Sequence, residues 1–356
     1  MDREQGVIME NKRIGVVFGS RSEEYEVSLM SAAAVIKVAK EISGYEIIPL
    51  GITRDGQWRI FNGSLESLET DKWQAFSQQL EIGRLKEVVD FVLPILHGAN
   101  GEDGTIQGLF EMLDIPYGGC GVLASSLAMD KAVAKEVFKC AGLPQCKHLF
   151  LRGEEIIEDP EAVKTRVEEN ISFPVFVKPA NMGSSVGITK VKKPEELIGA
   201  LKNALHYDRR IVVEEGVNCR ELEVSVIGNT IEDMEVSAIG EILPAEEFYD
   251  YKAKYQAEGK SKLMIPAKLS EEDEKEIKRL AKKAFLAIDG QGFARIDFFK
   301  DKKLGTIYIN EINTIPGFTK FSMMPLLWEE AGVGFSEFIK RIVGYGYERY
   351  NVKNCR

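Results

Sequence analysis

Four polar residues near the C-terminus could bind a metal ion and a phosphate group together. They lie in two segments, GFARIDFF and YINEINTIPGF, whose alternation of polar and apolar residues is typical of strands. In an extended chain Arg295 and Asp297 share one face of the first strand, and Glu311 and Asn313 share one face of the second. Carboxylate and amide oxygens are hard ligands that Mg²⁺ prefers, and a guanidinium is a forked donor that matches phosphate oxygens. The pattern therefore predicts magnesium-dependent ATP chemistry.

The alternative is an ordinary hairpin whose charged face is solvated and carries a surface ion pair. Against it, we expect the opposite faces of the two strands to be apolar, which sets the charged side apart from the core. The residues assigned to these apolar faces are Phe293, Ile296 and Phe298 on the first strand, and Ile309 and Ile312 on the second. The run NTIPG then ends the second strand sharply, as binding loops beside rigid sites often do. The functional interpretation is therefore favoured.

The composition limits the classes of protein to consider. The chain has 356 residues, enough for two or three domains, and a formal net charge of -10. This charge argues against nucleic acid or an anionic membrane as the main partner, since both favour clustered Lys and Arg. The five cysteines contain no C-x-x-C pair, and no apolar leader or membrane-length stretch is visible. We therefore expect a cytoplasmic protein with reduced cysteines.

The order of apolar and polar segments predicts three units after a flexible lead-in of residues 1–12. Residues 13–122 alternate strand and helix patterns, which predicts a doubly wound parallel sheet. Residues 123–215 are typical of an α+β unit with an antiparallel hairpin. Residues 216–356 form a second α+β unit with an antiparallel sheet, which carries the four polar residues above. A long polar tract within it, residues 245–262, is expected to be a functional loop.

A loop rich in glycine and serine could hold phosphate. Its sequence is NMGSSVG, and its glycines allow backbone N–H groups to approach phosphate oxygens, while Ser184 and Ser185 add hydroxyl donors. It is neither a Walker A loop, which needs Gly-Lys-Ser/Thr, nor a dinucleotide fingerprint, which needs a helix to follow. A plain hairpin turn is the alternative. Lys131, Lys178 and Lys254 could supply the positive charge that an anion needs, although a single lysine is more often solvated.

Acidic residues at two other places allow both a structural and a functional interpretation. Glu214 and Glu215 end an apolar strand, where a carboxylate or a backbone carbonyl could meet an adenine or ribose; an acidic strand end is the alternative. In the segment SEEYEVS, one carboxylate could cap the following helix and a second could hold a substrate ammonium group. His97, after the strand VDFVLPIL, could orient such a carboxylate or be a buried structural histidine.

Taken together, these segments resemble those of D-alanine:D-alanine ligases, the ATP-grasp enzymes of peptidoglycan synthesis. The resemblance runs from about Arg13 to Gly344 and rests on FGSRSEEYEVSLMSA, LHGANGEDGTIQG, MDK, FVKPANMGSSVGITKV, EFYDYKAKY, FARIDFF and NEINTIPGFT, in the family's order. It implies a three-domain ATP-grasp fold. It also implies that ATP joins two D-alanines through a D-alanyl phosphate, with release of ADP and phosphate. We further expect two Mg²⁺ or Mn²⁺ ions and a homodimer.

The resemblance implies roles for particular residues. At the first D-alanine it places Glu24, which would hold the ammonium group, with His97 and Glu102 in support. At the second D-alanine it places Gly317, Ser322 and Met323. The residues expected to contact ATP are Lys131, Lys178, Ser184, Ser185, Glu214, Glu215, Val217, Glu221, Lys254, Arg295, Phe299 and Asn310. The expected metal ligands are Asp297, Glu311 and Asn313, and the expected catalytic residues are Glu24, Ser184, Tyr255 and Arg295.

Related ligases use D-serine or D-lactate as the second substrate. Tyr255 resembles the tyrosine of the alanine-using class, and Met323 is apolar where serine users tend to place a polar or basic group, so both favour D-alanine. Met324 departs from the family, in which a tyrosine is common at this position. A different ATP-grasp carboxylate-amine ligase and a catalytically silent nucleotide-binding protein are two further hypotheses; the retained metal set argues against the silent protein.

Overall fold

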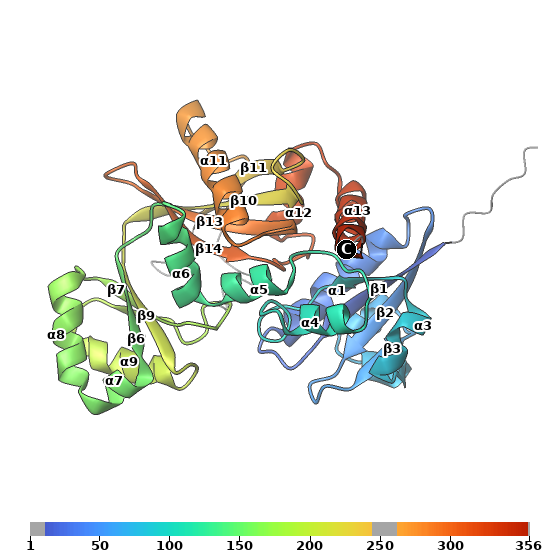
Figure 1. Ribbon diagram of the computed structural model, residues 1–356, viewed down its shortest axis with the longest axis horizontal. Coiled ribbons are helices and arrows are strands. Elements are labelled where there is room, and N and C mark those ends of the chain that lie inside the picture. Colours follow the sequence, from blue (N-terminus) through green and yellow to red (C-terminus); the bar gives the residue numbers. More distant parts are fainter. Residues whose placement is uncertain (1–10, 244–261, 355–356) are drawn as a thin grey trace, which may run out of the picture.

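The computed structural model describes residues 11–243 and 262–354, which form three β-sheets with helices packed against them (Figure 1). The strand orders are β4-β3-β2-β1-β5 in the first sheet, β6-β9-β7-β8 in the second and β12-β11-β10-β13-β14 in the third. In the first sheet β1 pairs in parallel with β2 and β5, and β3 and β4 extend it through antiparallel pairs. The strand pairs of the other two sheets are all antiparallel. The predicted fold class, an α/β unit with a parallel sheet followed by two α+β units, is confirmed.

The first sheet is covered on both faces because its central strands are almost wholly apolar. Ile14, Val16 and Phe18 of β1 pack with α1 and the C-terminal helix α13 (Phe335–Asn354), whereas Val17 packs with α4 on the other face. The strands are β1 (Lys12–Gly19), β2 (Tyr45–Ile52), β3 (Trp58–Phe61), β4 (Ser77–Gln79) and β5 (Phe91–Pro94). The helices are α1 (Tyr25–Ala39), α2 (Leu65–Glu69), α3 (Leu85–Val88) and α4 (Thr105–Met112), with 3-10 helices η1 (Trp73–Phe76) and η2 (Ile82–Arg84).

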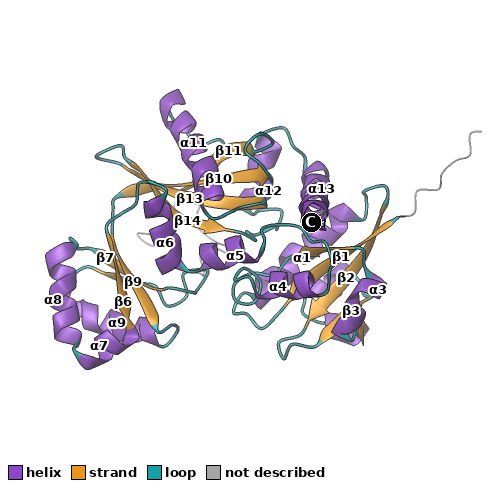
Figure 2. Ribbon diagram, in the orientation of Figure 1, coloured by secondary structure: helices purple, strands orange, loops and turns teal. Residues whose placement is uncertain are grey.

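The second sheet has a helical face and a face that carries charge. Val175 and Val177 of β7 pack with the helices in one core, so the alternate residues Phe176 and Lys178 point to the opposite face. The strands are β6 (His148–Arg152), β7 (Val175–Pro179), β8 (Thr189–Val191) and β9 (Arg210–Glu215). The helices, purple against the orange strands in Figure 2, are α7 (Gly153–Glu158), α8 (Pro160–Asn170) and α9 (Leu197–Leu205), with the 3-10 helix η3 (Pro194–Glu196).

The third sheet is likewise divided into an apolar and a polar face. Leu222, Val224 and Ile296 pack with α5, α6 and α11. On the other face α12 lies against β10 and β11, and its contact with β11 forms a separate apolar cluster. The strands are β10 (Cys219–Gly228), β11 (Glu235–Leu243), β12 (Lys262–Met264), β13 (Gly292–Asp301) and β14 (Ile307–Asn313). The helices are α5 (Val122–Met129), α6 (Lys131–Cys140), α11 (Glu271–Ala287), α12 (Met323–Glu330) and α13 (Phe335–Asn354).

A β-bulge in β14 corrects part of the predicted strand pattern. Asp297 pairs with Glu311 and Phe298 with Ile309, which leaves Asn310 as the extra residue. The bulge explains how Ile309 and Ile312, three positions apart, join the same core. The assignment of Phe293 to the face of Ile296 and Phe298 was wrong. Strict alternation puts Phe293 on the other side, where its ring lies 5.5 Å from that of Phe318, centroid to centroid.

Part of the predicted site lies outside the described residues. Lys254, Tyr255 and nearly all of the long polar tract fall in the range 244–261, and most of the lead-in falls in the range 1–10. Among the helices that the structure describes, none combines the length and apolar character needed to cross a bilayer.

Candidate active site

The second and third sheets, together with helices and loops beside the first sheet, border a cavity of about 1720 Å³ that collects the predicted site residues. Those that line it are Glu24, His97, Glu102, Lys131, Lys178, Ser184, Ser185, Glu214, Glu215, Val217, Glu221, Arg295, Phe299, Asn310, Glu311, Asn313, Gly317, Ser322 and Met323. Asp297 is not in the lining, but its carboxylate contacts Arg295 and Asn313, which are. Segments almost 300 residues apart in the sequence therefore meet in one common site, as predicted.

Two rows of polar residues cross β10, β13 and β14 on the cavity side of the third sheet. In register, the rows are Ser225, Arg295 and Asn313, and next to it Glu223, Asp297 and Glu311. The hairpin prediction for β13 and β14 is thus confirmed, and β10 adds Glu223, which sequence reasoning missed. The signal was present in the segment ELEVSV, because its alternation places Glu221, Glu223 and Ser225 on one face.

Arg295 is held along one edge of its guanidinium group. Nε lies 2.7 Å from Oδ1 of Asp297 and 2.9 Å from Oε2 of Glu223, and Nη2 lies 2.7 Å from Oδ2 of Asp297. Burial alone would lower the pKa of Arg295, but the two carboxylates raise it well above its ordinary value. Nη1 has no hydrogen-bond partner among the described residues. This edge can donate to an anion in the cavity.

The predicted metal ligands offer the oxygen chemistry that Mg²⁺ or Mn²⁺ requires. Asp297 and Glu311 are direct neighbours across the β13–β14 pair, and Asn313 Nδ2 donates to Oδ2 of Asp297 over 3.0 Å. No group of three or more His, Cys, Asp or Glu side chains is arranged as a ready-made metal site in the described chain. Two carboxylates and an amide leave coordination positions for phosphate oxygens, the usual arrangement when magnesium binds with a nucleotide. The residues therefore fit the ion.

Glu214 is engaged by two buried lysines, one of which lines the cavity with it. Lys135 Nζ lies 2.7 Å from Oε1, and Lys178 donates to Oε2. Burial favours the neutral acid, yet the attraction of both ammonium groups lowers the pKa of Glu214 to about 2. The carboxylate predicted for adenine or ribose lines the cavity and also holds Lys178. Sequence reasoning missed Lys135, although it stands four residues after Lys131, which places both on one side of α6.

Lys131 connects α6 to the glycine- and serine-rich loop. Its Nζ donates to the carbonyl of Met182 over 2.6 Å, and its backbone N–H donates to that of Ala180 over 3.0 Å. Burial lowers the pKa of Lys131, and the carboxylate of Glu311, 3.9 Å away, acts in the opposite direction. Asp130 caps α6 by accepting hydrogen bonds from two backbone N–H groups of its first turn. The motif MDK thus fixes one lysine beside both the loop and the metal residues.

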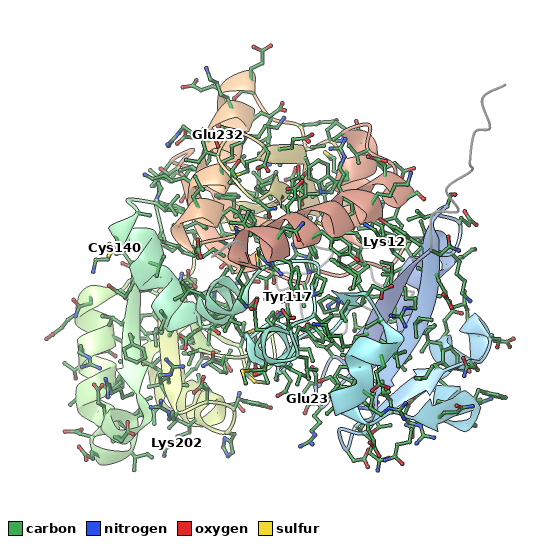
Figure 3. All side chains as sticks on the ribbon, turned by 45° about the vertical axis from the view of Figure 1, so that its right-hand side comes forward. Lys12, Glu23, Tyr117, Cys140, Lys202 and Glu232 are labelled. Carbon is green, nitrogen blue, oxygen red and sulfur yellow. The ribbon has the colours of Figure 1, made fainter. Side chains whose placement is uncertain are left out.

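Glu24 and Ser184 meet across the cavity. Ser184 Oγ donates a hydrogen bond to Oε1 of Glu24, which is buried, whereas its neighbour Glu23, labelled in Figure 3, is exposed. A Cβ atom built at Gly98 or Gly183 would lie 2.6 or 2.7 Å from Oε2 of Glu24, closer than real Cβ atoms approach. Two glycines therefore make room for this carboxylate. Glu24 and Ser184, both expected at the site, are thus joined by a direct hydrogen bond that the sequence did not predict.

Ser184 and Ser185 both have left-handed backbones, with φ of 47° and 62°. Residues other than glycine, asparagine and aspartate rarely adopt this conformation, and it costs roughly 1–2 kcal/mol per residue. Strain of this kind is typical of ligand-binding segments that the rest of the structure holds in place.

His97 and Glu102 clamp the loop that follows β14. His97 Nδ1 donates to the carbonyl of Ile315 over 2.8 Å, and Oε1 of Glu102 accepts from the N–H of Ile315 over 3.2 Å. The other ring nitrogen of His97 accepts from Ser31 Oγ at 3.0 Å, and Oε2 of Glu102 accepts from the N–H of Gly98 at 2.8 Å. The first sheet and the third sheet are thereby joined at one backbone position.

The pKa values of both clamp residues, His97 and Glu102, are shifted from their ordinary values. Burial lowers the pKa of His97, which fits a neutral ring that donates through Nδ1 and accepts through Nε2. Burial and the nearby carboxylate of Glu24 raise the pKa of Glu102 to about 8. Ile315 was not predicted as a site residue, because a backbone contact leaves no mark on its side-chain type.

The loop before α12 forms the end of the cavity expected for the second substrate. Ser322 Oγ accepts from the N–H of Thr319 over 3.1 Å, and a Cβ atom built at Gly317 would lie 2.8 Å from this hydroxyl. Met323 is largely buried and packs with Ile242 and Leu327. Met324, the departure from the family, lies in the core with α13 and not in the cavity lining.

Part of the cavity wall is apolar and suits an aromatic ring. Phe176, Val217 and Phe299 line it, and Phe299 is the neighbour of Glu221 across the β10–β13 pair. Flat apolar walls beside a carboxylate can accept a base and a ribose hydroxyl.

Comparison with known proteins identifies similar chains. The family "D-ala D-ala ligase N-terminus" matches residues 13–120, and "D-ala D-ala ligase C-terminus" matches residues 137–344. A D-alanine--D-alanine ligase of Thermoanaerobacter sp. (strain X514) is 48% identical over 98% of this chain and 99% of its own length. One of Acetivibrio thermocellus is 44% identical over 96% and 97%.

Solved structures show the same architecture. The VanG D-Ala:D-Ser ligase from Enterococcus faecalis superposes with a TM-score of 0.84 at 37% identity, over 94% of this chain and 99% of its own. The D-alanine-D-alanine ligase from Coxiella burnetii superposes with a TM-score of 0.83 at 29% identity, over 97% and 96%.

Proposed function

The chain belongs to the D-alanine–D-alanine ligase family, and we propose how its residues carry out the reaction that this membership assigns to it. The enzyme uses ATP to join two D-alanines into D-alanyl-D-alanine, a precursor of peptidoglycan. The observation that carries the proposed mechanism is that one cavity holds a buried carboxylate, Glu24, and a cationic group, Arg295 with Lys131 and Lys178. The first suits an amino acid's ammonium group, and the second suits a polyphosphate.

In the first step, the carboxylate of one D-alanine attacks the γ-phosphorus of ATP, and ADP leaves. A carboxylate is a poor acyl donor, so this converts it into an acyl phosphate, D-alanyl phosphate. Glu24 holds the substrate ammonium and thereby aims its carboxylate at the phosphate. Nη1 of Arg295 and the ammonium groups of Lys131 and Lys178 stabilise the negative charge on the transferring group.

Asp297, Glu311 and Asn313 would hold the two Mg²⁺ or Mn²⁺ ions that we expect to accompany ATP. The support is their donor chemistry and their position in adjacent rows of the sheet beside Arg295. When bound, such ions offset the charge of the phosphate oxygens.

In the second step, the deprotonated amine of the other D-alanine attacks the acyl carbon. The tetrahedral intermediate carries an oxyanion to which Arg295 can donate. Its nitrogen loses one proton, and its collapse breaks the bond to phosphate, which leaves, and completes the peptide bond. Ser322 and the backbone at Gly317 receive the carboxylate of this second substrate. An acyl phosphate reacts with water, so the loop at Ser184, together with Tyr255, would close over the site.

D-Alanine is the favoured second substrate. Met323 presents an apolar side chain between Ile242 and Leu327, which gives a hydroxyl group no partner of its own there. Because one solved relative is a D-Ala:D-Ser ligase, the acceptor needs a direct test. Phosphate release should be measured with D-alanine alone, with D-serine or D-lactate added, and with L-alanine, and the products identified by mass. Equal phosphate release with L-alanine would contradict the assignment.

We also infer a cytoplasmic homodimer with the three functional units 13–122, 123–215 and 216–356, which binds neither nucleic acid nor membrane. The net charge of -10 supports the absence of binding to nucleic acid or membrane. Exposed apolar side chains at the end of α4 and the start of α5, Met112 and Leu123, could lie in the subunit contact. Sedimentation of the wild type and of Leu123→Asp tests this, since a monomeric wild type would contradict it.

A further inference from the structure

Lys135 is a buried lysine beside the ATP site that does not itself reach the cavity. It is 2% exposed and does not belong to the cavity lining, and its Nζ lies 2.7 Å from Oε1 of Glu214. Buried lysines are rare and need a reason, because an ammonium group loses its hydration there. The ion pair with Glu214 explains how Lys135 is tolerated, but not why the chain places a lysine at this position.

Glu214 serves two lysines at once. Its second oxygen accepts from Lys178, which lines the cavity on β7, next to β9 that carries Glu214. Lys135 approaches the other oxygen of the same carboxylate from α6 and is not in the cavity lining. The three residues thus form a cluster in the order Lys135, Glu214, Lys178, of which Glu214 and Lys178 line the cavity and Lys135 does not.

The net charge of this three-residue cluster depends on Lys135. Glu214 and Lys178 alone would be a neutral pair, whose carboxylate competes with phosphate for the same ammonium group. With Lys135 the three groups carry a net charge of about +1 at neutral pH, and the carboxylate is shared. Charges interact more strongly with one another in a buried cluster than in water. Lys178 is the member through which this positive charge acts on a ligand.

We propose that Lys135 is a positioning residue for ATP: through Glu214 it fixes Lys178 and keeps a net positive charge beside the nucleotide phosphates. This inference rests on the proposed function, since it assumes that Lys178 faces phosphate. It assigns to Lys135 no contact with substrate. It therefore predicts that the net charge of the cluster, and not the presence of Lys135 itself, sets the affinity for nucleotide phosphate.

The test compares the affinities of ADP and adenosine, measured by calorimetry on the full chain. Lys135→Met makes the cluster neutral, and ADP should bind on the order of tenfold more weakly, whereas adenosine, which lacks phosphate, should bind as before. The double variant Lys135→Met with Glu214→Gln restores the charge of +1 through Lys178. Its ADP affinity, relative to that of adenosine, should return to within about threefold of the wild type.

A matched control removes a lysine from an ion pair on the other side of the third sheet. Lys300 pairs with Asp273 at the start of α11, and Lys300→Met should leave the ADP affinity unchanged. Lys135→Gln keeps a hydrogen-bond donor toward Glu214 without the charge. It should match Lys135→Met, and it replaces that variant if the methionine protein does not fold.

Two results would overturn the inference. One is an equal loss of ADP and adenosine binding in Lys135→Met or Lys135→Gln, which indicates a purely structural role. The other is a double variant weaker for ADP than the single one, because charge would then not be the controlling quantity. Failure of the proposed function looks different: the wild type itself would bind no ADP, or would release no phosphate with D-alanine.

Discussion

Replacement of Gly183 by alanine should disturb the first D-alanine subsite with little effect on ATP. The Cβ atom would lie 2.7 Å from Oε2 of Glu24, about 0.7 Å inside the 3.4 Å at which ordinary contact begins. Gly183 does not have a left-handed backbone, so alanine brings no backbone strain of its own. Glu24 or the loop must therefore shift by a large fraction of an ångström. A misplacement of 1 Å near reacting groups can cost about 100-fold in rate.

We expect kcat/KM for the first D-alanine to fall roughly 10- to 100-fold in Gly183→Ala, while the KM for ATP changes by less than about threefold. The assay is steady-state phosphate release with each substrate varied in turn. Gly199→Ala in α9 is the matched control, since a Cβ atom there meets nothing within 4 Å. It should keep full activity and gain roughly 0.5–1 kcal/mol of stability, as expected for alanine within a helix.

A Gly183→Ala enzyme with an unchanged kcat/KM for D-alanine would refute this role of Gly183. A fall in ATP and D-alanine affinities by the same factor would also count against it, because the contact involves Glu24 and not the lysines.

Three further predictions concern the charged residues. Glu223→Gln should lower kcat about tenfold by loosening Arg295, whereas Glu241→Gln, which breaks a pair with Arg220, should leave kcat unchanged; equal effects would refute the special role of Glu223. The pKa of Glu214 is lowered to about 2, so its contribution to stability is present above pH 4.5 and is lost as the pH falls toward 2. The melting temperature of the wild type should therefore fall more steeply over this pH range than that of Glu214→Gln. Glu311→Gln, or removal of divalent ions by EDTA, should abolish phosphate release without unfolding the chain; unchanged turnover would contradict the metal assignment.

The hairpin of the site could be predicted from the sequence because strand alternation is a local property. Arg295, Asp297, Glu311 and Asn313 converge as their spacing indicates. The bulge at Asn310 could not be predicted, since it depends on how β14 fits its partner. Phe293 was misassigned because its apolar character was given more weight than its position in the alternation.

Residues that act across elements were the ones missed. Glu223 reaches Arg295 because β10 is the neighbour of β13, and Lys135 reaches Glu214 because α6 packs on the second sheet. These neighbours are set by tertiary packing, which one sequence does not reveal. The clamp on Ile315 uses backbone atoms of that residue. Lys254 and Tyr255 lie outside the described residues, and their roles stay predictions.

The most direct test of the mechanism follows the oxygen atoms of D-alanine. The proposed reaction requires a carboxylate oxygen of the first D-alanine to attack the γ-phosphorus and to leave with phosphate when the peptide bond forms. With D-alanine labelled by ¹⁸O in its carboxylate, mass spectrometry of the released phosphate should find one labelled oxygen for each dipeptide made. Dipeptide formation with unlabelled phosphate would contradict the acyl-phosphate route.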